Sequence, residues 1–307
     1  MQRAWKMLTS YIDVAVAFVL AVVILGLDIA GLTSSKVVQS ATMATLAVVS
    51  IVLLRDRARG DNQTLEVQRS VDALQRQIDV RVISGTECNR ILTDARRDTD
   101  RWVFRGATGA YIRAVTLPEC VSAARPRRRR LDFRLEILDP MNPDLCHQFV
   151  SLHQRLATGP DSPEQSWTVD QTRRELFATI LAACWHQQRY EMLAIDVRLS
   201  SAYSLLRYEM STSCLIFTQR GPEFPALVIN SGTPTYLVWE SELHVSFQQA
   251  KRLPLQSVKQ LPLSDVPPPD EVRRVFQALG LELPADYTDD DLTDIRKLAL
   301  ESADPYA

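Results

Sequence analysis

The chain has 307 residues, and its charge is nearly balanced, with 35 Lys and Arg against 37 Asp and Glu. A formal net charge of −2 argues against a protein that attracts nucleic acid through an overall positive field. The five cysteines are odd in number and widely separated, which is typical of reduced thiols rather than of a disulfide framework. None forms a C-x-x-C pair, so no zinc site is expected.

Two apolar runs lie back to back near the N-terminus. Residues 7–27 carry Asp13 as their only charge, and residues 37–54 carry none. A helix needs about 20 apolar residues to cross the hydrocarbon core of a membrane, so the two runs predict a transmembrane helical hairpin over residues 1–55. A cleaved signal peptide is the main alternative for the first run. Residues 26–28 form a poor cleavage site, however, and the second run would then need its own explanation as a stop-transfer helix.

The charges that flank the two runs predict how the hairpin is oriented. Two cations lie within residues 3–6 and three within residues 55–59, whereas the connecting loop holds only Lys36, offset by Asp28. Short cytoplasmic segments of membrane proteins are enriched in Lys and Arg. We therefore expect a two-pass membrane protein with both termini and the body of the chain in the cytoplasm.

The second run also predicts a surface for contact between helices. Its small or hydroxyl residues Ser40, Ala44, Ala47 and Ser50 are spaced three to four apart, as close helix packing requires. Asp13 would cost roughly 2.5–3.5 kcal/mol at the centre of the bilayer, so it is expected to face protein or water. One hypothesis is that clustered hairpins bring Asp13 and this surface to a shared polar seam. The alternative is that Asp13 reaches the lipid headgroups from the end of its span.

The remainder of the chain predicts three further sections. Residues 56–80 have the apolar spacing of an amphipathic or coiled-coil connector. Residues 81–255 alternate between strand and helix patterns, which predicts a cytoplasmic α/β domain with a mixed sheet and packed helices. Residues 256–307 combine a proline-rich linker with two short acidic helices, and we expect them to form a small C-terminal helical appendage.

The expected elements of the α/β domain and the appendage follow from periodicity and from turn residues. Residues 111–117 are compatible with a helix or a strand that ends at Pro118. Helices are expected at residues 90–101, 144–156, 170–190, 270–279 and 289–300, and strands at residues 131–138, 193–199, within 207–218, at 226–229 and at 236–239.

Arginines supply the candidate contacts to an anionic ligand. Arg127 and Arg128 belong to a basic run at residues 125–130, which is expected to be a solvated loop or to lie on anionic lipid headgroups, with a nucleotide or nucleic-acid contact as the alternative. Arg105, Arg113 and Arg207 are candidates for the lining of an anionic pocket. Each is equally compatible with a surface ion pair.

Three groups of short motifs carry a resemblance to a known class of proteins. They are Trp102-Val-Phe-Arg-Gly106 with Gly109, Tyr111, Arg113 and Thr116-Leu-Pro118, then Ile137-Leu-Asp-Pro140 with Asn142, and finally Asp196-Val-Arg-Leu-Ser200 with Arg207-Tyr-Glu209. This pattern resembles the soluble domains of two-helix membrane effectors of bacterial antiphage systems, encoded beside retrons or cyclic-nucleotide synthases. Such domains often look like a degenerate half of phospholipase D.

The resemblance implies a non-enzymatic effector of abortive infection. The cytoplasmic domain would sense a signal or partner, and the hairpins would oligomerise among the membrane lipids and disrupt the inner membrane. The implied partner is a reverse transcriptase or nucleotidyltransferase system, or a nucleotide signal. No cofactor or metal is implied.

Catalytic motifs are missing from the sequence. Phospholipase D chemistry needs His-x-Lys-x(4)-Asp, and none of the four histidines has Lys two residues later. There is also no P-loop, no G-x-S-x-G elbow and no H-E-x-x-H pair. On the long helix, His186 is expected to be a packed or surface residue and Cys184 a core residue. Trp102 is expected to be a core anchor, with a base-stacking platform as the alternative. A membrane-anchored phosphodiesterase, or a lipid or nucleic-acid hydrolase with an unrecognised active site, remains the alternative.

Overall fold

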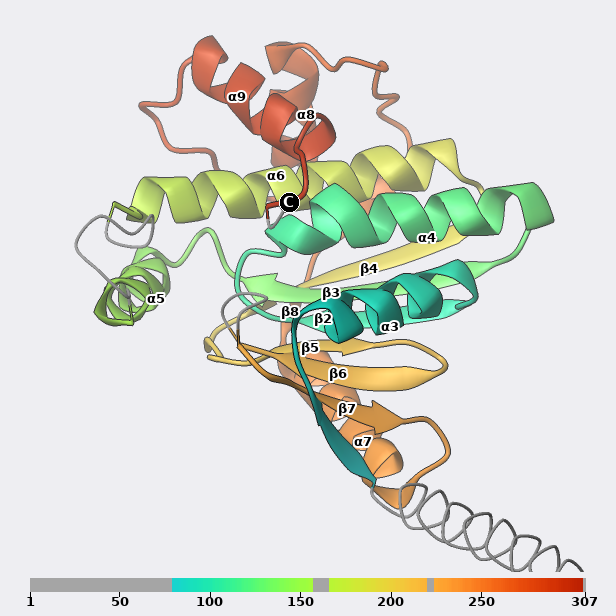
Figure 1. Cartoon of the computed structure of the whole chain (residues 1–307). Coiled ribbons are helices and arrows are strands. Elements are labelled where there is room, and N and C mark those ends of the chain that lie inside the picture. Colours follow the sequence, from blue (N-terminus) through green and yellow to red (C-terminus); the bar gives the residue numbers. More distant parts are fainter. Residues whose placement is uncertain (1–78, 157–165, 220–223, 306–307) are drawn as a thin grey trace, which may run out of the picture. The chain divides into compact units, whose positions relative to one another are not determined.

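The computed structural model of the protein describes residues 79–156, 166–219 and 224–305. Asp79–Ala307 form one compact unit. Its centre is an eight-stranded mixed sheet with the strand order β1-β7-β6-β5-β2-β3-β4-β8 (Figure 1). The strands are β1 (Val80–Ile83), β2 (Arg101–Arg105), β3 (Leu131–Leu138), β4 (Leu193–Ser200), β5 (Arg207–Met210), β6 (Cys214–Thr218), β7 (Ala226–Asn230) and β8 (Lys251–Arg252).

Three neighbouring strands of the sheet, β2, β3 and β4, are parallel, and the other pairs are antiparallel. Helices join and cover the strands. They are α3 (Gly85–Arg97), the π-helix η1 (Ile112–Thr116), α4 (Leu117–Ala124), the 3₁₀ helix η2 (Arg125–Arg127), α5 (Pro143–Arg155), α6 (Val169–Arg189), α7 (Pro234–Gln249), the 3₁₀ helix η3 (Leu255–Val258), α8 (Pro269–Ala278) and α9 (Asp289–Leu300).

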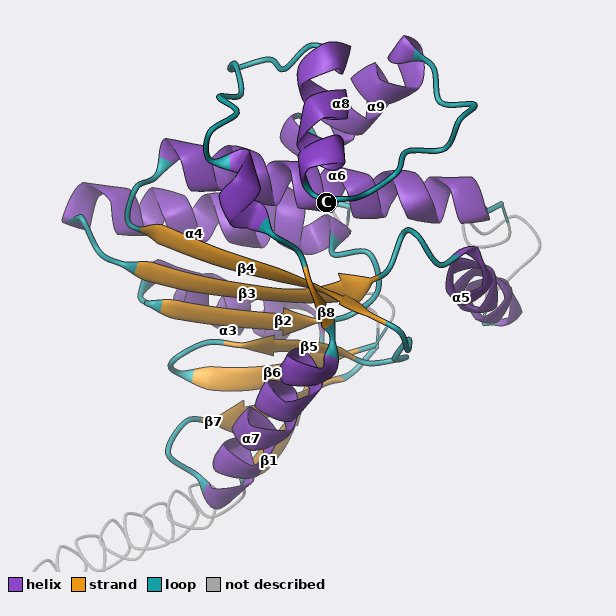
Figure 2. Ribbon diagram, turned by 180° about the vertical axis from the view of Figure 1, so that it is seen from behind, coloured by secondary structure: helices purple, strands orange, loops and turns teal. Residues whose placement is uncertain are grey.

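The two faces of the sheet carry different cores. Helices α3, α4 and α6 lie on one face, and α7 crosses the other (Figures 1 and 2). Trp102 and Phe104 of β2 are almost fully buried in the larger core, together with Cys184 of α6. Val103, between them in the sequence, belongs to a smaller core under α7, because alternate side chains of a strand point to opposite faces. The expected core positions of Trp102 and Cys184 are therefore confirmed.

The expected fold class is wrong in two respects. Among the described residues, no helix combines the length and the apolar composition that a membrane span needs. The proposed hairpin at residues 1–55 lies outside the described residues. So does the connector proposed at residues 56–80, except for its last two residues, where β1 begins at Val80. What the structure shows is a mixed eight-stranded sheet with packed helices.

The second correction concerns the C-terminal helices, which do not form an appendage. Helices α8 and α9 lie on α6 and contribute to the same core as the sheet (Figure 1). The rings of Phe177 on α6 and Phe276 on α8 meet edge to face with centroids 5.0 Å apart. Arg174 of α6 bridges Asp291 of α9 at 2.6 Å. Proline-rich segments mark a break in secondary structure, but they do not prevent the elements on either side from sharing a core.

The apolar run at residues 236–239 was expected to be a strand, and this was wrong. It belongs to α7, which begins after Thr233 and has Pro234 in its first turn. The Thr233 hydroxyl accepts a hydrogen bond from the Tyr236 backbone N–H at 3.3 Å and caps the helix. A four-residue apolar run does not distinguish a strand from a helix, whereas the capping residues before it do.

Candidate ligand-binding site

A cavity of about 260 Å³ opens beside the carboxyl ends of β2 and β4. The carboxyl edge of parallel strands is where α/β proteins commonly bind ligands. The turn after β2, the loop after β4, the start of β5 and one side of α5 form its walls. The lining residues are Phe104, Ala107, Thr108, Gly109, Ala110, Tyr111, Ile112, Phe149, Leu152, His153, Leu156, Trp167, Tyr203, Ser204, Leu205, Arg207, Glu209, Gln219 and Pro305.

Glycines allow the turn after β2 to form this wall. Gly109 has a φ of +71°, a left-handed conformation that side chains other than glycine rarely adopt. A Cβ at Gly109 would also lie 3.1 Å from Thr179 Cγ2 of α6. The turn leads directly into η1, and the Arg113 backbone N–H donates to the Gly109 carbonyl at 2.9 Å. Short π-helices are frequent at functional sites, and η1 supplies Ile112 to the cavity.

Aromatic rings that pack against one another form one wall of the cavity, and hydrogen bonds hold one of them, Trp167. Phe149 and His153 of α5 stack with their centroids 5.5 Å apart and an angle of 23° between the rings. The ring of Trp167 meets His153 edge on at 6.0 Å. The Trp167 indole N–H donates to Thr172 Oγ1 at 2.9 Å, and Gln154 Nε2 donates to the Trp167 carbonyl at 2.9 Å. These bonds fix the Trp167 side chain before any ligand enters.

Glu209 of β5 is the buried carboxyl group in this lining. Only 4 % of its surface is exposed, and Thr116 Oγ1 donates a long hydrogen bond of 3.5 Å to Oε2. Burial raises the pKa of the Glu209 carboxyl, while the nearby charges of Arg207 and Arg96 and the bond from Thr116 act in the opposite direction. Burial and the surrounding groups therefore shift the pKa of Glu209 in opposite directions. Within the described part of the chain, its carboxyl group has one weak hydrogen-bond partner, Thr116.

A network beneath the cavity orients Tyr111 and supplies positive charge. Arg96 Nε donates to Glu119 Oε2 at 2.7 Å, and its Nη1 donates to Tyr111 Oη at 3.3 Å. Burial, reinforced by the Glu209 charge, raises the pKa of the Cys88 thiol to about 11. Burial likewise raises the pKa of the Cys120 thiol to about 12. Both cysteines therefore remain thiols at neutral pH, which argues against a nucleophilic cysteine here.

The arginines proposed from the sequence lie in different places. Arg207 lines the cavity. Arg105 lies on the opposite face of the sheet, where it pairs with Glu136 at 3.3 Å and faces the Tyr208 ring at 5.6 Å. Arg113 is buried against Glu175 of α6 at 2.7 Å. The three side chains therefore do not converge on one anionic pocket.

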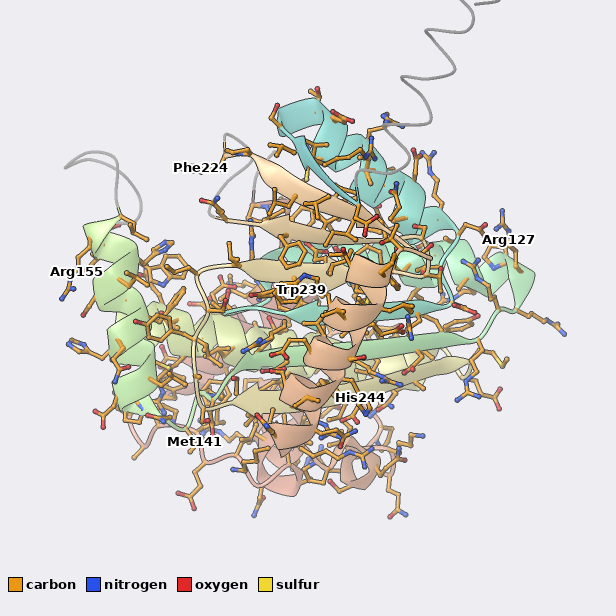
Figure 3. The ribbon with its side chains drawn as sticks, turned by 90° about the horizontal axis from the view of Figure 1, so that it is seen from below. Arg127, Met141, Arg155, Phe224, Trp239 and His244 are labelled. Carbon is orange, nitrogen blue, oxygen red and sulfur yellow. The ribbon has the colours of Figure 1, made fainter. Side chains whose placement is uncertain are left out.

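The basic run and the proposed membrane contacts are also separate from the cavity. Arg127 is exposed and pairs with Asp98 at 3.3 Å, and Arg128 is exposed with a φ of +47°. Figure 3 shows Arg127 at the opposite end of the molecule from α5, which carries Arg155. Asp13, Ser40, Ala44, Ala47 and Ser50 lie outside the described residues.

A second, more polar groove lies between α7 and strands β3, β4 and β8, beside His244 (Figure 3). Its charges pair with one another. Arg134 bonds Asp132 at 2.9 Å, and Asp196 accepts from Arg198 at 3.5 Å and pairs with Arg252 at 3.3 Å. Because neighbouring charges neutralise each other in this groove, it is a weaker candidate for a binding site than the aromatic cavity.

Sequence reasoning missed most of the residues that form the cavity. Phe149, Trp167, Tyr203 and Glu209 were not among the expected site residues. Glu209 carried a detectable signal, because it is a carboxylate between Tyr208 and Met210 in a short strand. Among the described residues, no group of three or more His, Cys, Asp or Glu is arranged to hold a metal ion.

Comparisons with known proteins add no family assignment. No protein-family model matches the sequence, and no curated protein matches it significantly. TrmBL2, an archaeal chromatin protein with a novel mode of DNA binding, aligns with a TM-score of 0.33 and 7% identity over 67% of this chain and 70% of its own. Phosphatidylserine synthase from Haemophilus influenzae Rd KW20 aligns with a TM-score of 0.38 and 13% identity over 72% of this chain and 44% of its own. Neither likeness is close enough to carry an argument.

Proposed function

We propose that the domain of residues 79–305 is a sensor that binds a small planar aromatic ligand in the cavity beside β2 and β4. The observation that supports this most directly is the aromatic wall of Phe149, His153 and Trp167, whose rings pack against one another and whose Trp167 indole is fixed by a hydrogen bond to Thr172. Small-molecule sites are typically concave and apolar with few polar groups, as this cavity is.

Binding rather than catalysis is the activity that these side chains support. The Cys88 and Cys120 thiols near the cavity are held protonated, so neither supplies an activated nucleophile at neutral pH. Stacking on aromatic side chains contributes about 1–3 kcal/mol per base in nucleic-acid complexes, and it tolerates many planar rings. A sensing role agrees with the effector suggested by the sequence resemblance, whose membrane output remains a prediction about residues outside those described.

The test is a titration of the purified full chain, followed by tryptophan fluorescence. The probes are guanosine, inosine, adenosine, cytidine and indole, each raised to about 1 mM, a concentration that detects binding of about −4 kcal/mol. At least one probe should quench the fluorescence saturably. Trp167→Phe should abolish this signal, because Trp167 lines the cavity.

The matched control is Trp239→Phe. Trp239 lies on α7, on the opposite face of the sheet (Figure 3), and packs with Tyr208 and Phe217. Its substitution should leave the Trp167-dependent quenching unchanged. If no probe produces saturable quenching that depends on Trp167, the proposed function is wrong.

A further inference from the structure

Glu209 carries information about the ligand beyond its planar shape. Its carboxyl group is nine-tenths buried, lines the cavity and has one long bond of 3.5 Å from Thr116. Buried polar groups in proteins are almost always hydrogen-bonded, and an unsatisfied one calls for an explanation. A carboxylate has room for about four hydrogen bonds, and the described residues supply one long bond to Glu209, which lines the cavity.

We propose that the cavity selects a planar heterocycle that presents two adjacent N–H donors to Glu209, as the amino-lactam edge of guanine does. This inference rests on the proposed function, because it requires the aromatic cavity to be the ligand site. Guanine offers N1–H and one N–H of its 2-amino group side by side, and a carboxylate accepts both. The aromatic rings would stack on the plane of the base, while the Glu209 carboxylate accepts hydrogen bonds from the N–H groups at its edge.

The charges around Glu209 argue against other ligand classes. An organic cation would also satisfy a carboxylate, but the Arg207 charge, which lowers the pKa of Glu209, already supplies positive charge beside this group. A purely apolar ligand would displace water from Glu209 and leave its oxygens without partners, which is unfavourable. A neutral ligand with N–H donors avoids both costs.

The same geometry discriminates among nucleobases. Adenine and cytosine each place a ring-nitrogen acceptor beside their amino group, so an acceptor lone pair would face the carboxylate. Uracil has one N–H between two carbonyl oxygens. Hypoxanthine keeps N1–H but lacks the amino group. An unfavourable contact with the wrong ligand contributes to specificity as much as a good contact with the right one.

The framework around Glu209 holds the carboxyl in place. Glu209 is the register partner of Phe104 on β2, so its Cα position is set by the ladder of the sheet. Thr116 belongs to the π-helix η1, whose preceding turn is fixed by Gly109. A preorganised acceptor of this kind loses little entropy when the ligand binds.

The test compares guanosine, inosine and adenosine on the full chain, using the same fluorescence titration. Guanosine should bind about 10- to 100-fold more tightly than inosine, because one hydrogen bond to a charged group is lost. Adenosine should bind more weakly still. Glu209→Gln should lower guanosine affinity at least about tenfold, because an amide in place of the carboxylate has one acceptor oxygen instead of two and places a donor against the base.

Glu242→Gln is the matched control, since Glu242 is exposed on α7 and the same chemical change there should not alter binding. Equal affinity for guanosine and adenosine, or unchanged guanosine affinity in Glu209→Gln, would overturn the ligand assignment. If Trp167-dependent binding of some other probe persists in that case, the sensor function itself stands. If no probe binds the wild-type chain in a way that depends on Trp167, both the sensor function and the ligand assignment are wrong.

Discussion

Phe104 of β2 and Glu209 of β5 are partners in the antiparallel register, and both side chains line the cavity. The sheet thus places an aromatic ring beside a buried carboxyl by backbone hydrogen bonds alone. The ring is also covered by the turn that follows its own strand. A Cβ added at Gly106 would lie 2.5 Å from Phe104 Cζ, closer than real Cβ contacts allow.

Gly106→Ala should therefore move the Phe104 ring and change the cavity without altering any polar group. We expect a destabilisation of about 1–3 kcal/mol, as for other overpacked cores, and a guanosine affinity at least about tenfold lower. Urea unfolding and fluorescence titration measure the two effects. The double variant Gly106→Ala with Phe104→Leu should recover part of the lost stability, and strictly additive effects would show that the ring is not what the methyl group meets.

Glu209→Gln should make the folded protein more stable at neutral pH. The folded-state pKa of this carboxyl is raised above its unfolded value, chiefly by burial. Its stabilising contribution is therefore complete below the unfolded pKa and is lost as the pH rises through the folded pKa. At pH 7 the variant should gain about 1 kcal/mol in unfolding free energy, and the gain should shrink towards pH 4. A variant that is more stable but binds less is typical of a functional site. A variant that is less stable at pH 7 would contradict this account.

His186 should make the wild-type protein less stable as the pH falls, whereas Glu209 makes it less stable as the pH rises. Burial, followed by the charges of Arg125 and Arg189, lowers the pKa of its imidazole to about 4. The stabilisation is complete above the unfolded value near 6.5 and is lost as the pH falls through 4, a change on the order of 3 kcal/mol. His186→Gln should lose less stability than the wild type between pH 7 and pH 4.

The control for this prediction is His244→Gln, which makes the same chemical change at an exposed position on α7 (Figure 3). Urea unfolding at several pH values gives the comparison. Parallel stability curves for the wild type and His186→Gln would show that His186 does not contribute to acid sensitivity.

Local sequence patterns predict the elements of this domain better than their assembly. The alternation at residues 131–138 identifies β3, and Thr168 with Gln171 forms a capping box at the start of α6. In contrast, α7 was assigned to a strand because four apolar residues were weighed without the cap at Thr233. The union of α8 with the main core was missed because it depends on contacts such as Phe177 with Phe276, which no local pattern encodes.

The cavity was missed for a related reason. Its walls come from segments separated by many residues, and they meet only because β2 pairs with both β3 and β5. Periodicity reveals that Arg207 and Glu209 share one side of a strand, but not which strand lies next to it. Arg105 and Arg113 looked equivalent to Arg207 in the sequence, yet neither lines the cavity, and each pairs with a carboxylate elsewhere in the domain.

Arg113 shows how such a carboxylate changes the role of an arginine from ligand binding to stability. Its side chain is 2 % exposed and that of its partner Glu175 is 14 % exposed, with 2.7 Å between Nη2 and Oε2. Nη1 also donates to Thr179 Oγ1 at 3.1 Å and to the Glu175 carbonyl at 3.2 Å. The side chain therefore ties η1 to α6 from within the core.

Arg113→Met should destabilise the fold by about 3–5 kcal/mol, because it leaves the Glu175 charge without its buried partner. Adding Glu175→Leu should restore much of this loss, since the pair is then replaced by apolar side chains. Arg90→Met is the matched control. Arg90 and Asp94 form an exposed pair with side chains 66 % and 55 % exposed, and its loss should cost less than about 0.5 kcal/mol. The free energies of unfolding are measured in urea for the wild type, the two single variants and the double variant. Equal decreases in Arg113→Met and Arg90→Met would mean that the buried pair contributes no more to stability than an exposed one.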